Sequence, residues 1–316
     1  MHRLAFVALP RIMRSHERER VDLRPSLVAT LDERRRRSQT AATGLGWLWR
    51  ACILFVTLAT AGHAAAERPV VVVTTSLIAT AVRDVAGDAV DVETLMPAGT
   101  CPGQFDLEPQ QVRRVRAAVL VIRHDMQGFL DTRFAAAGVP ADAVIAPAFG
   151  EPFNVPTNYA EYCSRVAAEL ARRVPTIAGV CGPRLAVIRA QAARTAEEMR
   201  RQAQPLAGVH VVAAAFQAGF LRWLGLDVVA TFPPADDPPP NVLKTAVATG
   251  RASGAVLVVG NEQNGRRVPA AIAQAVGVEV AMLSNFPARS AAGAYGELVE
   301  ANLKVLLDWH AQQKNK

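Results

Sequence analysis

The chain has 316 residues, of which 51% are hydrophobic and 20% carry a charge. This is a globular composition, long enough for about two domains. The formal net charge of +7 comes mainly from arginines in residues 11–37, and the rest of the chain is close to electrical balance. Since no basic stripe interleaved with aromatic residues follows, we expect no nucleic-acid partner.

The chain begins with a basic segment, residues 1–43, which we expect to be a disordered leader. Residues 44–66 then have the parts of a secretory signal peptide: a basic flank, an apolar stretch over 51–61, and small residues at 64–66. The apolar stretch is shorter than the roughly 20 residues that a membrane-spanning helix needs. We therefore expect export by this signal peptide, with the working protein beginning near Glu67. An uncleaved membrane anchor is the alternative.

Three cysteines follow the signal segment, namely Cys101, Cys163 and Cys181. An odd number in an oxidising compartment leaves at least one thiol unpaired. A bridge between Cys163 and Cys181 is the simplest pairing and leaves Cys101 free, although the geometry of a bridge does not follow from sequence alone.

From residue 67 onward, short apolar runs alternate with helical patterns. In the first half, strands are expected over 70–75, 90–95, 118–122 and 143–146, and helices over 76–86, 109–116 and 127–137. Strands that alternate with helices predict a parallel sheet that is covered on both faces.

The second half starts with two helical segments, 158–173 and 183–204, of which the second is long and amphipathic. The alternation then resumes, with strands expected over 209–214, 227–231, 255–259 and 279–283 and helices over 219–224, 242–253, 267–276 and 294–311.

Together these elements predict an α/β protein of two Rossmann-like lobes with parallel sheets. The lobes are residues 67–182 and 205–316, and the long helix over 183–204 joins them. We expect a ligand cleft between the lobes, at the carboxyl ends of the strands, because ligands of open α/β sheets bind there. A linker made of one helix predicts only small movement of the lobes.

Two loops in the first lobe carry side chains that could face such a cleft. Residues 101–109 offer the Cys101 thiol, the Gln104 amide and the Asp106 carboxylate, and a rigid turn set by Pro and Gly is the alternative. His124 follows a strand and stands beside an acid, which fits either a ligand or a surface ion pair. Cys101, Asp106 and His124 are tentative metal ligands.

The second lobe adds polar groups at three more strand ends. Gln217 either faces the cleft or caps the next helix. Glu262 and Gln263 lie in a polar cluster that is either a turn or part of the cleft, and Asn285 follows the last strand. With Gln104, Asp106 and His124, these residues form the expected ligand-binding set.

The sequence lacks the motifs of common enzyme classes. It contains no nucleophile elbow, phosphate-binding loop or zinc-protease helix, and no Cys/His cluster with structural-zinc spacing. Missing motifs do not exclude catalysis, but they favour a binding protein. We therefore expect no enzymatic activity.

Several segments together resemble the substrate-binding components of zinc and manganese ABC transporters. They are residues 72–79, residues 87–99 with the Pro/aromatic/acid/Pro loop that follows, the long connecting helix, and Phe220–Leu226. The resemblance implies two α/β lobes, a rigid linking helix and a divalent metal ion, zinc or manganese, held as cargo in the cleft. It also implies a periplasmic protein that delivers this cargo to an inner-membrane permease driven by an ATPase. We expect a monomer.

The sequence departs from this family where the resemblance places the metal ligands. The first family histidine falls at Gly103 or Gln104, and the second falls near Asn154. The third falls around Ala215–Gln217, and the closing aspartate falls at about Asn285. Zinc favours nitrogen and sulfur donors, which neutral amides replace poorly, so we do not expect a tight tetrahedral zinc site.

These observations predict an exported, non-enzymatic solute-binding protein of an ABC transporter that captures a metal ion for import. One alternative is a protein that binds a metal–chelate or a small polar organic solute through its amides. Another is a degenerate periplasmic interaction factor that keeps the fold without transport.

Overall fold

The computed structural model describes residues 68–98, 105, 107–150, 152–234 and 238–315. The expected leader (1–43) and signal peptide (44–66) lie outside these ranges, and so do Cys101, Gln104 and Asp106. Within these ranges, no helix combines the length and the apolar character needed to cross a membrane.

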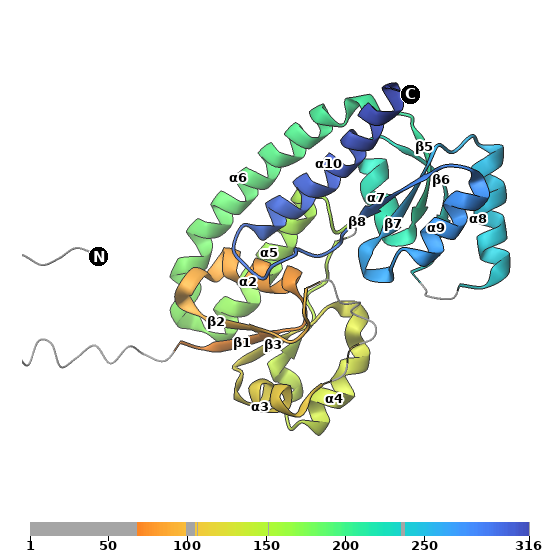
Figure 1. Cartoon of the computed structure of the whole chain (residues 1–316). Helices are drawn as coiled ribbons and strands as arrows, with labels where there is room; N and C mark the ends of the chain where they lie inside the picture. The colour runs from red at the N-terminus through yellow and green to blue at the C-terminus, as the bar shows by residue number, and fades with distance from the viewer. Residues whose placement is uncertain (1–67, 99–104, 106, 151, 235–237, 316) are drawn as a thin grey trace, which may run out of the picture. The chain divides into compact units, whose positions relative to one another are not determined.

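The first sheet consists of four short parallel strands in the order β2-β1-β3-β4 (Figure 1). The strands are β1 (Val70–Val73), β2 (Asp91–Thr94), β3 (Leu120–Ile122) and β4 (Val144–Ile145). Because β1 and β3 are interior strands with buried side chains, their sequences are unbroken apolar runs rather than alternating ones.

Helices α2 (Ser76–Ala86) and α3 (Pro109–Ala117) follow β1 and β2. The Thr75 side chain caps α2 by accepting a hydrogen bond from the backbone of Ile78. The first residue of α3 is a proline, which suits a helix start because its missing N–H has no partner there in any case. The 3-10 turn η1 (Gly87–Ala89) leads from α2 into β2.

The helix expected over 127–137 differs from the structure. A 3-10 segment, η3 (Asp125–Leu130), comes first and is followed by the short helix α4 (Asp131–Ala136). The break lies at Gln127, whose backbone is non-helical, and Gly128 next to it has low helix propensity. A further 3-10 turn, η4 (Ala141–Ala143), precedes β4.

Two long helices lead from the first sheet to the second. They are α5 (Pro156–Arg173) and α6 (Ala178–Gln202), with the 3-10 turn η5 (Pro175–Ile177) between them. The connecting helix α6 begins at Ala178 rather than at Pro183, so the proline lies inside it. Proline removes one backbone hydrogen bond, but α6 packs along α5 and α2, and this tertiary packing keeps the first turns helical (Figure 1).

The second sheet repeats the arrangement of the first, with parallel strands in the order β6-β5-β7-β8. The strands are β5 (His210–Ala214), β6 (Asp227–Phe232), β7 (Leu257–Asn261) and β8 (Glu279–Leu283). The helices are α7 (Ala215–Trp223), α8 (Pro240–Ala252), α9 (Arg267–Val276) and α10 (Ala294–Lys314), with 3-10 turns η6 (Gln204–Leu206) and η7 (Glu262–Asn264).

The predicted fold class is confirmed, since two four-stranded parallel sheets are connected by one long helix. The largest cluster of buried apolar side chains draws residues from both sheets and from α5, α6 and α10. This shared core ties the two sheets and these helices to one another.

The expected bridge between Cys163 and Cys181 is wrong in this structure, because both cysteines are free. Both side chains are buried in the apolar cluster around α5 and α6, where a free cysteine packs as a small hydrophobic residue. Burial also raises the pKa of each thiol, which makes the thiolate needed for disulfide formation scarce.

Thiol titration can check this directly. For the exported form carrying Cys101→Ser, unfolded in denaturant without reductant, we expect both Cys163 and Cys181 to react as free thiols. Titration after reduction is the control and should give the same count. A count that rises only after reduction would show that the two residues are bridged.

Candidate ligand-binding site

Five buried amide side chains meet at the carboxyl end of the second sheet. We call them the amide cluster: Asn154, Gln217, Asn261, Gln263 and Asn285. Asn154 precedes α5, and Gln217 lies in the first turn of α7. Asn261 is the last residue of β7, Gln263 follows β7, and Asn285 follows β8. Since the strands are parallel, their carboxyl ends meet at one edge, and this places residues far apart in sequence together.

Direct hydrogen bonds join the centre of the amide cluster. Asn154 Nδ2 donates to Gln217 Oε1 at 3.2 Å and to Asn285 Oδ1 at 3.3 Å. Gln217 Nε2 donates to Asn285 Oδ1 at 2.9 Å and to Asn261 Oδ1 at 3.2 Å. Gln217 therefore connects three other amides, and its complete burial makes each of these bonds costly to lose.

The loop after β8 is fixed from two sides. Asn285 N donates to Gln263 Oε1 at 3.0 Å, and Gln263 Nε2 donates to Ser284 Oγ at 2.9 Å. From α10, Asn302 accepts a hydrogen bond from Ser284 N at 2.9 Å and donates to Ser284 O at 2.8 Å. These bonds hold the Asn285 side chain in position before any ligand arrives.

A glycine in α7 allows the first lobe to reach this loop. A Cβ atom at Gly219 would lie 3.0 Å from side-chain carbons of Pro152, which is too close for ordinary packing. The small residue therefore lets the segment before α5 approach α7 and brings Asn154 within reach of Gln217. Tyr295 secures the same segment, since its hydroxyl donates to Phe153 O at 3.0 Å.

His124, at the end of β3, is buried beside the amide cluster. The centroid of its ring lies 6.3 Å from that of Phe153 and 5.6 Å from that of Phe286. Phe153 is the residue before Asn154, and Phe286 is the residue after Asn285. His124 Nε2 shares a hydrogen bond of 2.9 Å with Thr75 Oγ1, whereas its Nδ1 is buried without a partner. Burial lowers the pKa of His124 to about 4, so the ring is neutral at neutral pH.

Contacts between the loop after β8 and the first lobe close the site. Ser76 Oγ, at the start of α2, donates to Pro287 O at 2.8 Å, and Thr94 Oγ1 donates to Ser290 Oγ at 3.2 Å. Both partners from the first lobe lie at the carboxyl ends of β1 and β2. The candidate site therefore draws its walls from both sheets.

The candidates expected from sequence fall into three groups. Gln217, Gln263 and Asn285 come together in the amide cluster, and His124 lies beside it. Glu262 is exposed and does not join them. Gln104, Asp106 and Cys101 lie outside the described residues.

Sequence reasoning did not select Asn154 or Asn261 as site residues. Asn261 ends β7 and begins the polar run 261–264, so its place at a strand end was an available signal. Asn154 precedes a helix rather than following a strand, and its signal was the family resemblance, which puts the second metal histidine near it.

The described site offers hydrogen bonds rather than charge. No group of three His, Cys, Asp or Glu side chains able to hold a metal ion is found in the parts of the chain that the structure describes. Asn154 Oδ1 and His124 Nδ1 are buried polar atoms without partners, and buried atoms of this kind usually find one. The arrangement suits a polar solute that supplies complementary donors and acceptors.

Two α/β lobes joined by a long helix, with a polar site at their facing strand ends, are the architecture of a solute-binding protein. The chain belongs to the family of the periplasmic zinc-uptake complex component A, ZnuA, which matches residues 71–308. This family comprises metal-binding, non-enzymatic solute-binding proteins of ABC transporters.

Solved structures show the same fold at low sequence identity. A crystal structure of ZnuA is 20% identical, covers 77% of this chain and 99% of its own, and has a TM-score of 0.63. The structure of FpvC from Pseudomonas aeruginosa in complex with Ni²⁺ is 17% identical in sequence and has a TM-score of 0.66. The match covers 78% of this chain and 98% of FpvC. A manganese-bound periplasmic protein of Candidatus Liberibacter asiaticus is 13% identical in sequence and has a TM-score of 0.66. The match covers 77% of this chain and 100% of that protein. No curated protein sequence matches the chain significantly.

Proposed function

We propose that this chain is the extracytoplasmic component of an ABC importer and that it captures a metal as a chelate with a small polar molecule. The cargo lies between the lobes 67–182 and 205–316, at the amide cluster and His124. The lobes turn slightly about the linker 183–204, and the chain acts as a monomer. It delivers the cargo to a permease and an ATPase of the inner membrane.

The chemistry of three residues carries this proposal. Asn154, Gln217 and Asn285 fall close to where the family resemblance puts metal ligands, and each is a neutral amide bonded to another of the three. Amides are weak ligands for zinc but good partners for the carboxylate, hydroxyl or amide groups of a chelating molecule. In a chelate, the organic molecule supplies the metal's donors and the protein recognises the outside of the complex.

A second candidate is direct capture of a divalent ion such as zinc or manganese. The unpartnered Nδ1 of His124 favours it, because neutral imidazole is a common metal ligand. Cys101 and Asp106 would have to supply the remaining donors. Coordination by a thiolate and an imidazole would weaken as these donors become protonated at low pH.

Native mass spectrometry of the protein, isolated without added metal from the cells that produce it, separates these candidates. We expect a mass increment equal to a metal plus an organic molecule. An increment equal to a bare metal ion would favour direct capture, and an increment without metal would contradict both. Asn154→Ala should remove the increment, whereas Asn241→Ala, at an exposed position in α8, should keep it.

A further inference from the structure

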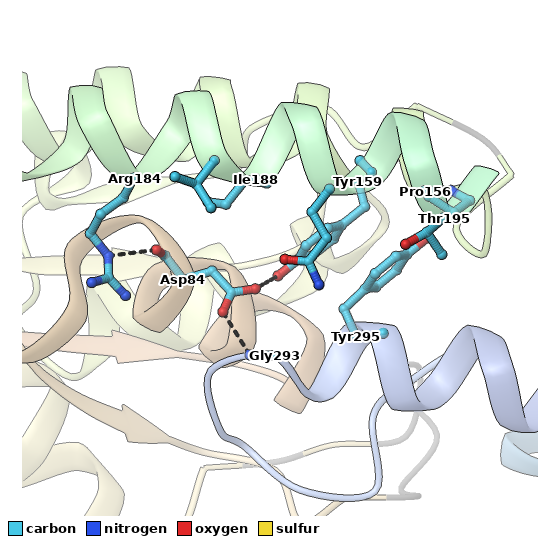
Figure 2. Close-up of a pocket in the computed structure, with 12 residues that line it drawn as sticks. Asp84, Pro156, Tyr159, Arg184, Ile188, Thr195, Gly293 and Tyr295 are labelled. Carbon is cyan, nitrogen blue, oxygen red and sulfur yellow. Dashed lines mark hydrogen bonds between the residues drawn. The ribbon is translucent and has the colours of Figure 1, made fainter. Parts of the chain in front are cut away.

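A cavity of about 370 Å³ opens among α2, α5, α6 and the start of α10 (Figure 2). Its volume falls in the range of pockets that hold small organic molecules. None of the residues that line it belongs to the amide cluster or contacts His124. The cavity is therefore a site separate from the one proposed for the transported cargo.

The polar feature of this cavity is the half-buried carboxylate of Asp84. Its Oδ2 accepts a hydrogen bond of 2.6 Å from the Tyr159 hydroxyl, and its Oδ1 accepts one of 2.8 Å from Gly293 N. Both donors are neutral groups. Burial raises the pKa of Asp84, and these two hydrogen bonds only partly oppose this effect.

The guanidinium of Arg184, at the edge of the cavity, bonds to main-chain oxygens rather than to this carboxylate, and its charge only partly opposes the rise in the pKa of Asp84. Arg184 Nε donates to the main-chain oxygen of Asp84 at 2.8 Å, and Nη2 donates to that of Arg83 at 3.3 Å. Arg184 is also exposed, so solvent and salt screen its charge. The carboxylate oxygens of Asp84 are therefore not bonded to the Arg184 side chain, although its screened charge still acts on them.

The remaining walls are apolar and aromatic. The rings of Tyr159 and Tyr295 are stacked with centroids 3.8 Å apart and planes at 3°. On the facing side of α6, Val187 is 63% exposed although it is an aliphatic side chain, and Ile188 lies one residue further on. An apolar body would shield these surfaces from water.

We propose that this cavity binds a small organic ammonium compound, with the cationic nitrogen at Asp84 and an apolar body against α6. Each carboxylate oxygen has used one lone pair, so each can accept a further hydrogen bond from an ammonium group. The lining comes from α2, α5 and α6, together with the start of α10. A bound ammonium compound therefore contacts elements of both lobes.

Calorimetry on the full chain with three probes of similar size tests the charge requirement. We expect 2-phenylethylammonium to bind, the neutral 2-phenylethanol to bind at least about tenfold more weakly, and the anionic 3-phenylpropanoate not to bind. Equal binding of the alcohol and the ammonium compound would overturn the proposal. So would preferential binding of the anion, or no binding of the ammonium probe at about 10 mM.

Two variants locate the site. Asp84→Asn keeps an acceptor for the neighbouring donors but removes the charge, and it should weaken binding of the ammonium probe roughly 10- to 100-fold. Asp88→Asn removes the same charge at an exposed position outside the cavity and should leave binding unchanged. Ala192→Phe fills the cavity without altering its charge and should also abolish binding. Unchanged binding in Asp84→Asn and Ala192→Phe would place the probe elsewhere.

Discussion

Replacing Gln217 with leucine is expected to lower the free energy of unfolding by about 2–4 kcal/mol and to abolish capture of the cargo. The variant keeps an aliphatic side chain of similar size but removes a donor and an acceptor. Asn261 Oδ1 loses its donor, and Asn285 Oδ1 loses the shorter of its two hydrogen bonds. Asn154 Nδ2 also loses one of its three acceptors. A buried polar atom without a partner costs about 1–3 kcal/mol, and the weaker hydrogen bonding of the other two atoms adds to this cost.

Chemical denaturation of the variant and of Gln274→Leu measures this effect. Gln274 is an exposed glutamine in α9, so the same exchange there should change stability by less than about 0.5 kcal/mol. If Gln217→Leu were as stable as the wild type, the amides would be satisfied by water, and the buried network could not be the feature that organises the site.

Much of the fold follows from the sequence because each element carries its own signal. Helix α9 and strand β8 have the predicted boundaries, since a continuous apolar pattern defines each of them. The errors occur where local and tertiary preferences conflict. Pro183 and the glycines beside it predict a later start for α6, but packing against α5 and α2 extends the helix backward.

The candidate site was less predictable. Parallel strands direct their carboxyl ends to one edge, so Gln217, Gln263 and Asn285 could be selected by position alone. Their partners could not, because Asn154 bonds to Gln217 across 63 positions and to Asn285 across 131. The burial of His124 depends in the same way on Phe153 and Phe286, which arrive from distant segments.

The lack of net charge on the buried site residues bears on the form in which the cargo could bind. Neutral amides present dipoles without net charge, so the amide cluster by itself does not repay the cost of dehydrating a free cation. A chelate with little net charge loses less hydration on entry.

The stability of the protein is expected to fall as the pH drops from about 6.5 to about 4, and His124 should account for about 3 kcal/mol of this fall. In the folded state burial lowers the pKa of His124 to about 4, whereas the unfolded chain titrates near 6.5. Between these values the unfolded state binds more protons, so acidification favours it. The contribution of His124 is fully present above the unfolded pKa and is lost as the pH approaches the folded pKa.

Denaturant titrations at several pH values between 4 and 7 measure this contribution, with His124→Gln as the comparison. Glutamine keeps a polar side chain that can bond to Thr75 but does not titrate, and the pH dependence of all other groups cancels in the difference. We expect the difference in unfolding free energy between the two proteins to change by about 1.4 kcal/mol per pH unit within this window. A difference that does not vary with pH would mean that the ring titrates alike in both states and is therefore solvated in the folded protein.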